Sequence, residues 1–340
     1  MELELVTTPE GISALAREWN GLLPDNATNE IFLTWQWQHT WWNAYHPGDL
    51  WTLVGRDEAG EVVGIAPWFI EQPSRVVRTV GCVEVTDYLD VLVKPAYRET
   101  FLAALADFVA EHQDAYSRIV LCNMPHTTPT LDLMPRLLTE RGFAVRVAQQ
   151  EVCPVISLPD SFEDYLAALD KKQRHELRRK LRRAEGSETD TVDWYIVGRE
   201  HDLAEELEKF VKLMAASHPA KAKFLEDPPN MAFFRAIAPI TAACGWLQLT
   251  FLTVDGVPAA GYLNFDYNNR ILVYNSGLLP EGYAHLSPGI VLLTYNIRYA
   301  IEHGRKAFDF LRGNEEYKYR MGGVDQPVMA LEAIPERPTV

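Results

Sequence analysis

Residues 271–323 read ILVYNSGLLPEGYAHLSPGIVLLTYNIRYAIEHGRKAFDFLRGNEEYKYRMGG. The first four residues form a short apolar run that favours a strand, and a glycine-broken loop follows at residues 275–286. Ser287-Pro288-Gly289 then predicts the start of a helix, because serine is a good N-cap and proline is tolerated in the first turn. Gly304 ends that helix, and residues 306–311 again favour a strand. The stretch therefore predicts a strand–loop–helix–strand unit of an α/β fold.

The start of the predicted helix is a candidate anion site. Backbone N–H groups at a helix start lack partners, and the helix dipole favours negative charge there. Gly289 would let a ligand approach the backbone closely because it has no Cβ. An ordinary strand–helix connection would have the same pattern, so a structural role stays open. The polar residues after the second strand favour the functional interpretation: Arg312, Glu315, Tyr317 and Lys318.

Length and composition predict a globular protein of two domains. The chain has 340 residues, of which 47% are hydrophobic, and this length suits two compact domains. Its net charge of -15 argues against a general nucleic-acid coat, which needs a basic surface. The four cysteines show no C-x-x-C spacing and the nine histidines no H-x-x-x-H pair. We therefore expect scattered free thiols and no metal site.

No targeting segment is recognisable in the sequence. Residues 1–5 contain neither a basic region nor an apolar run, so no signal peptide is predicted. The uncharged run at residues 236–254 contains Pro239 and Gly245 and is interpreted as a helix end, a turn and a strand rather than a membrane span. With the scattered thiols, these features lead us to expect a cytoplasmic protein.

The order of predicted elements repeats in the two halves. Each half reads as helix, hairpin, strand, helix and strand, and the second hairpin turns at Asp255-Gly256. This repetition predicts two copies of one α/β fold. We expect an N-terminal domain at residues 1–158, a basic connecting helix at 159–190, and a C-terminal domain with the donor site at 191–340.

The connecting segment concentrates positive charge. Residues Lys171 to Arg183 include eight Lys or Arg and one Glu, on a chain that is acidic overall. A solvated helix face and a patch that docks an anion both fit such a run. The anions that we consider are coenzyme phosphates, lipid headgroups, an acidic polymer and RNA.

Two segments of the first half could line a binding cleft. Residues 35–42 contain four tryptophans, more than a short helix needs for packing, although an aromatic stripe is more often core. Residues 76–93 are expected to form one long strand that carries two carboxylates. The candidates for acceptor binding are Trp35, Trp37, Asp87, Tyr88 and Asp90.

Three segments resemble one family. They are FLTWQW at residues 32–37, KKQRHELRR at 171–179, and SPG at 287–289 together with FDFLRGNEEYK at 308–318. They are similar to the CelD/BcsL-type acyltransferases, relatives of the FemAB-like proteins with tandem GNAT folds. The resemblance implies two tandem GNAT-like domains, each a mixed central sheet flanked by helices. It also implies acyl transfer to an amine, from acyl-CoA or, as FemAB-like proteins allow, from an aminoacyl-tRNA.

The chain departs from the usual GNAT phosphate signature, Q/R-x-x-G-x-G/A, because residues 283–289 read YAHLSPG. One glycine stands where two small residues are expected, which leaves the donor open. Three functions follow. The first is transfer of an acyl group, with acetyl-CoA as the leading donor, to an amine of a sugar, polysaccharide precursor or small metabolite. The second is aminoacyl-tRNA-dependent transfer, with Lys171 to Arg183 touching tRNA, and the third is a non-catalytic degenerate GNAT binding module.

Acyl transfer needs a phosphate cradle, a strand edge for the pantetheine amides, a base, and a donor for the oxyanion or thiolate. The candidates for the cradle and the edge are Ser287, Pro288, Gly289, Tyr274, Asn275 and Ser276. The catalytic candidates are Asp309 and His285 as bases, Tyr283 and Tyr317 as proton donors, and Lys318 as a partner of phosphate or oxyanion. Further acceptor contacts are expected from Arg312, Glu315 and Tyr317. A buried structural carboxylate at Asp309 and a surface ion pair at Lys318 are the alternatives.

Overall fold

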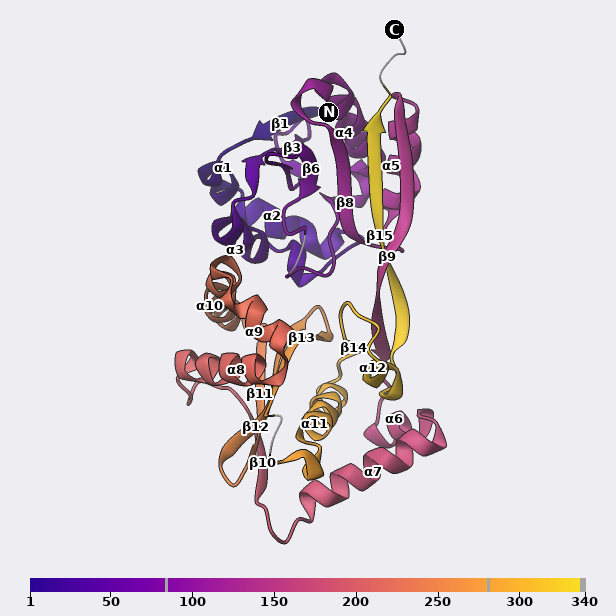
Figure 1. The fold of residues 1–340 in the computed structure, drawn as a ribbon. Coiled ribbons are helices and arrows are strands. Elements are labelled where there is room, and N and C mark those ends of the chain that lie inside the picture. The colour runs from indigo at the N-terminus through magenta and orange to yellow at the C-terminus, as the bar shows by residue number, and fades with distance from the viewer. Residues whose placement is uncertain (83–84, 280–281, 337–340) are drawn as a thin grey trace. The chain divides into compact units, whose positions relative to one another are not determined.

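The computed structural model describes residues 1–82, 85–279 and 282–336 (Figure 1). The chain divides into two compact units, which we call unit 1 (Met1–Val152 with Gln326–Val340) and unit 2 (Cys153–Asp325). Residues 326–336 therefore pack with the N-terminal half, whereas the sequence grouped residues 191–340 together. The basic segment at 159–190 lies within unit 2.

Unit 1 contains two sheets. An antiparallel sheet has the order β1-β3-β4-β7, formed by β1 (Glu2–Val6), β3 (Thr52–Arg56), β4 (Val62–Ala66) and β7 (Leu92–Val93). A second sheet is mixed, because β6 runs parallel to β8 but antiparallel to β5. Its order is β9-β15-β8-β6-β5-β2, with β9 (Phe143–Ser157), β15 (Val324–Pro335), β8 (Arg118–Pro125), β6 (Val76–Thr79), β5 (Trp68–Glu71) and β2 (Gly48–Leu50).

The helices of unit 1 pack on these sheets through large apolar side chains. Phe101, Leu102 and Leu105 of α4 are fully buried in one core with residues of both sheets. Gly64 on β4 makes room for this helix, since a Cβ there would lie 2.8 Å from the Phe101 ring. The helical segments are α1 (Pro9–Ala14), α2 (Ala16–Leu22), η1 (Leu23–Asp25), η2 (Ile31–Leu33), α3 (Trp35–Tyr45), η3 (Pro95–Tyr97), α4 (Arg98–Glu111), η4 (Gln113–Ala115) and α5 (Pro129–Thr139).

Unit 2 has one mixed sheet. An antiparallel meander of β10 to β13 is followed by β14, which runs parallel to β13 because α11 connects the two strands. The strands are β10 (Val192–Ile196), β11 (Leu247–Val254), β12 (Val257–Tyr267), β13 (Arg270–Leu278) and β14 (Ala307–Asp309). The end of β9 pairs with the far edge of β14. The predicted strand–loop–helix–strand unit is thus confirmed.

Helices cover both faces of the unit 2 sheet (Figure 1). On one face α11 packs on β12 and β13, with α6 and α7 in the same core. On the other face α8 packs against β12 and β13. The helical segments are α6 (Phe162–Ala168), α7 (Lys171–Glu185), α8 (Leu203–Ser217), α9 (Pro219–Glu226), α10 (Pro228–Ala243), η5 (Ala284–Leu286), α11 (Pro288–Glu302) and α12 (Glu316–Arg320).

The two strands that flank α11, β13 and β14, pair over only three residues. The register joins Arg270, Ile271 and Leu272 of β13 to the three residues of β14, and β13 then continues to Leu278 without a strand on that side among the described residues. Main-chain groups on this edge therefore have no ladder partner. The open edge and the start of α11 belong to the same connection.

Two expectations from the sequence are wrong. Residues 76–93 do not form one strand, because β6 ends at Thr79 and β7 begins at Leu92. The side chains of residues 87–90 therefore do not alternate across a strand. The thiols are not all free, since the fold brings Cys82 and Cys122 together in a disulfide across 40 residues of sequence. Among the described residues, Cys153 and Cys244 form no disulfide.

Gly277 fixes how closely α8 packs on β13. A Cβ at this position would lie 2.5 Å from the Met214 backbone nitrogen and 2.6 Å from the Leu213 carbonyl carbon. Because backbone cannot move aside as a side-chain end can, we expect Gly277→Ala to lower the free energy of unfolding by about 1–3 kcal/mol. Urea denaturation followed by circular dichroism measures it.

Gly21→Ala in α2 is the matched control, because nothing lies within 4 Å of a Cβ there. We expect that change to be neutral or slightly stabilising, as alanine is the better helix former. Equal stability of the two variants would contradict the packing described for Gly277.

Candidate active site

The start of α11 lies where the sequence places it, but its cap differs. Ser287 precedes Pro288 in the first turn and adopts a left-handed backbone with φ 53°. In this conformation its side chain makes no capping hydrogen bond. The hydroxyl instead accepts a hydrogen bond from Lys180 Nζ at 3.3 Å. The predicted helix start is confirmed, whereas the predicted capping by the Ser287 side chain is wrong.

A cavity of about 440 Å³ lies against this helix start. Five candidates from the sequence line it, namely Ser276, Ser287, Pro288, Gly289 and Tyr317. Lys180 of the basic run also lines it, and residues that the sequence did not single out complete the wall: Ser217, Tyr262, Leu278, Leu279, Ala284 and Ile290. Gly289 also has a packing role, since a Cβ there would lie 2.7 Å from Leu278 Cδ2. Polar and apolar groups thus converge on one helix terminus.

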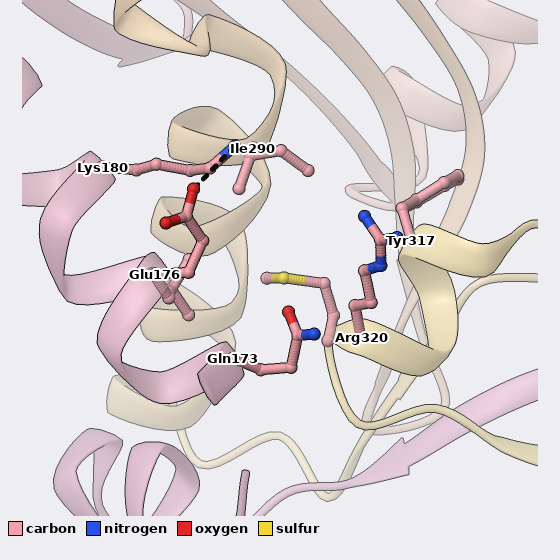
Figure 2. Close-up of a pocket in the computed structure, with 8 residues that line it drawn as sticks. Gln173, Glu176, Lys180, Ile290, Tyr317 and Arg320 are labelled. Atoms are coloured by element: carbon pink, nitrogen blue, oxygen red, sulfur yellow. Dashed lines mark ion pairs between the residues drawn. The ribbon is translucent and has the colours of Figure 1, made fainter. Parts of the chain in front are cut away.

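A smaller cavity of about 150 Å³ adjoins the first and shares Lys180, Ile290 and Tyr317 with it. Figure 2 shows Lys180 and Glu176 extending from α7 on one side, with Tyr317 and Arg320 from α12 opposite. The Lys180 ammonium lies 3.8 Å from the Glu176 carboxylate. Burial, with the nearby Glu315 charge, raises the pKa of the Tyr317 hydroxyl well above its usual value. Tyr317 therefore stays protonated at neutral pH and can act as a donor.

The basic helix α7 contributes to the same site. Leu177, Leu181 and Ala184 are buried against the unit 2 core, which fixes the rotation of the helix. Lys180 then reaches Ser287, and the Arg183 guanidinium donates to the His285 carbonyl at 2.9 Å. The sequence treats the basic run and the helix start separately. The spacing of three residues between the two cations is the signal that they share a helix side.

The open edge of β13 passes the cavity at Ser276. Leu279 N–H donates to Ala259 O at 3.0 Å, so in the antiparallel ladder Gly277 and Asn275 also face β12. Ser276 consequently turns its N–H and C=O to the open side. The Asn275 side chain accepts from that N–H at 3.0 Å, and Lys221 Nζ donates to that carbonyl at 2.6 Å. No sequence motif marks Lys221, which α9 supplies.

Known proteins resemble this chain in sequence over part of its length and in fold over nearly all of it. Residues 171–319 match the family model described as an acetyltransferase (GNAT) domain. A tandem GNAT protein from the clavulanic acid biosynthesis pathway, solved without AcCoA, superposes with a TM-score of 0.51 and 12% identity over 100% of both chains. The chain has a tandem GNAT fold. The fold predicted from the sequence is therefore confirmed, while membership of the CelD/BcsL group stays a prediction.

Two further solved structures have a fold similar to that of this chain. FemX superposes with a TM-score of 0.68 and 13% identity, over 99% of this chain and 98% of that chain. L-PGS from Bacillus licheniformis superposes with a TM-score of 0.56 and 10% identity, over 95% and 93%. At these identities the likeness concerns the fold alone. Among curated proteins, none matches the sequence.

Asp309 and Lys318 of the GNAT domain hold one turn from two sides. Asp309 is fully buried, accepts a hydrogen bond from Leu311 N–H at 2.8 Å, and lies 3.8 Å from the Arg270 guanidinium. Lys318 Nζ donates to the carbonyls of Leu311, Arg312 and Gly313 at 3.2, 2.8 and 3.1 Å. It also pairs with Glu315 at 2.9 Å. Neither residue lines the two cavities described above, and these contacts favour structural roles.

The other candidates of unit 2 lie around the cavities rather than in them. Tyr274 packs against Phe234 and Phe265 at ring distances of 5.7 and 5.2 Å. Tyr283 is half-buried against the core that contains α11. His285 is exposed, and its Nε2 lies 3.4 Å from an Asp190 carboxylate oxygen. Of the candidate catalytic residues named as bases or proton donors, Tyr317 alone lines the described cavities.

The acceptor candidates in unit 1 take part in internal contacts. Trp37 is fully buried and donates to the Thr86 hydroxyl at 3.0 Å, while Trp35 donates to the Ile12 carbonyl at 3.0 Å. Tyr88 is also buried. Asp87 and Asp90 are buried too. Burial raises the pKa of Asp90, although hydrogen bonds from Thr128 and Thr28 lower it in part. These contacts favour core roles for the five residues.

Across the part of the chain that the structure describes, no helix has the length and apolar content to span a membrane. Nor does any group of three or more His, Cys, Asp or Glu in that part have the arrangement to hold a metal ion.

The contacts of Asp309 generate a prediction about stability. Asp309→Ala removes the acceptor of Leu311 N–H and an acidic partner of Arg270, so we expect the free energy of unfolding to fall by about 1–3 kcal/mol. Asp160→Ala is the control, because its carboxylate is 99% exposed and pairs only at 3.9 Å with Lys306, which stabilises little. Chemical denaturation measures both. Wild-type stability in Asp309→Ala would contradict the structural role.

Proposed function

We propose that the protein is an N-acyltransferase that moves an acyl group from acyl-CoA to an amine. Acetyl is the leading candidate for this acyl group. The acceptor would be a sugar, a polysaccharide precursor or a small metabolite. The observation that supports this most directly is the convergence of the α11 start, Lys180 and the open β13 edge on one cavity. The match of residues 171–319 to an acetyltransferase domain supports the same chemistry.

The helix start would take the phosphates of the donor. The dipole of α11, a helix of 15 residues, favours negative charge at its first turn. Lys180 adds a full positive charge within hydrogen-bonding distance of Ser287. Leu278, Leu279 and Ile290 provide apolar wall for the pantetheine arm, whose amides would pair with the main-chain groups of the β13 edge.

The reaction itself requires few groups. The acceptor nitrogen attacks the thioester carbonyl carbon, a C–N bond forms, and the C–S bond breaks to release the thiolate. Tyr317, held protonated by burial, can donate its proton to the departing sulfur and regain one from the acceptor nitrogen. The net change moves one proton from nitrogen to sulfur. The products are an amide and a free thiol.

The exposed cations of α7 support a second candidate donor, an aminoacyl-tRNA. Leu177, Leu181 and Ala184 face the core, so the opposite side of the helix is basic and solvent-exposed. Its exposed cations are Lys171, Lys172, Arg178, Arg179, Arg182 and Arg183. A row of this kind can contact nucleic-acid phosphates.

Calorimetry distinguishes the two donors. We expect acetyl-CoA to bind, and the absence of binding at millimolar ligand would remove acyl-CoA as the donor. Binding of tRNA whose affinity falls steeply with salt would support the alternative instead.

Lys180 generates a prediction about donor affinity. Lys180→Met removes the cation beside the α11 start, so we expect acetyl-CoA to bind about tenfold to a hundredfold more weakly, as a hydrogen bond to a charged group contributes about 1.5–3 kcal/mol. Lys172→Met is the control, because it removes an exposed cation of the same helix that lines neither cavity. Equal losses in both variants would indicate general charge attraction rather than a site at Ser287.

A further inference from the structure

Lys221 occupies an unusual position for a lysine. It comes from α9, and its ammonium donates to the Ser276 carbonyl at 2.6 Å and to the Ser276 hydroxyl at 3.3 Å. Ser276 lines the larger cavity, as does Ser217 at the end of α8. The side chain of Lys221 thus reaches the open edge of β13 beside the cavity wall.

Half-buried Lys221 and buried Lys318 differ in how many of their ammonium hydrogens are used. An ammonium has three N–H donors. Lys318 directs its donors to three carbonyls and also pairs with Glu315, so it has no hydrogen to spare. Lys221 uses two donors on Ser276, and no third acceptor contacts it among the described residues. Of these two lysines, Lys221 is therefore the one with a donor left for a ligand.

We propose that Lys221 is a catalytic residue that donates its remaining N–H to the carbonyl oxygen of the acyl group being transferred. The inference rests on the acyl-CoA function proposed above. A donor whose pantetheine arm follows the β13 edge past Leu278 and Ser276 would bring its thioester toward this ammonium.

In the transfer step, Lys221 keeps its own proton. As the acceptor nitrogen attacks, the electron pair of the C=O double bond moves onto oxygen, where the Lys221 N–H stabilises the negative charge. The pair returns as the C–S bond breaks. The proton lost by the nitrogen ends on the thiolate sulfur, so the step balances without another reactant.

The charge on Lys221 depends on pH near neutrality. Burial lowers the pKa of Lys221 to about 8, and the negative Glu315 opposes that shift. Ser276 on β13 accepts the hydrogen bonds of this ammonium, and the nearby His218 ring accepts a hydrogen bond from Ala220 N–H. The ammonium is present below pH 8 and is lost as the pH rises through about 8. Interaction with the acyl oxygen should weaken over the same range.

Carbon-13 NMR of [1-¹³C]acetyl-CoA bound to the full chain tests the proposal without an acceptor. Hydrogen bonding to the carbonyl oxygen draws electrons from the carbon, so we expect a downfield shift on binding at pH 7. In the wild type the shift should fall as the pH rises through about 8. Lys221→Met should bind the donor without the shift, while Lys221→Arg should keep it to higher pH. Lys223→Met, an exposed lysine of the same helix, should resemble the wild type.

The outcomes separate the two proposals. If acetyl-CoA does not bind to the wild type, both the donor assignment and the role of Lys221 are overturned. If it binds but the shift is the same in Lys221→Met, or has the same pH dependence in Lys221→Arg as in the wild type, only the role of Lys221 is overturned. With an amine acceptor in hand, Lys221→Met should lower kcat by about a hundredfold to a thousandfold, the usual effect of losing one oxyanion donor. If Lys221→Met does not fold, the pH dependence of the carbon-13 shift in Lys221→Arg still tests the role of Lys221.

Discussion

The parallel pairing of β13 with β14 covers only three residues, and the site depends on this short pairing. Once the strands part after Leu272, the edge of β13 near Ser276 has main-chain groups that no strand satisfies. Such groups need other partners. In the free protein the Asn275 side chain and Lys221 provide these partners. The α11 crossover that joins the same two strands puts a helix start beside this edge.

The lysines around the site have two different kinds of partner: Lys318 bonds to a turn of the fold, whereas Lys180 and Lys221 bond to residues that line the cavity. Lys318, together with Asp309, fixes the turn at residues 311–313, where Leu311 adopts a left-handed backbone with φ 57°. This gives a physical reason for the spacing of aspartate, glycine and lysine in FDFLRGNEEYK. Lys180 and Lys221 reach the cavity wall from two different helices, α7 and α9. A motif can therefore mark a structural clamp while the lysines closest to the cavity wall lie outside it.

Part of the candidate site could be predicted from the sequence. Ser276, Ser287, Pro288, Gly289 and Tyr317 line the cavity. The first four belong to β13, α11 and the loop between them, and Tyr317 follows on α12 after the next strand, an order that is readable along the chain. Lys180 was included only as one cation of a run, and Lys221 was not singled out. Trp37 and Asp90 were candidates for acceptor binding, but residue type alone cannot decide this, because aromatic and acidic residues occur both in protein cores and in binding sites. Their burial shows which environment they occupy here.

The sequence by itself determined the local elements and their repetition: the hairpin at Asp255-Gly256, the helix that starts at Pro288, and the doubled α/β order. These features follow from backbone preferences and side-chain periodicity, which act over a few residues. Only the tertiary structure decided which cations meet the open strand edge, that Cys82 joins Cys122, and that the last strand packs with unit 1. Those outcomes depend on packing between segments far apart in the chain, and local preference carries no information about such contacts.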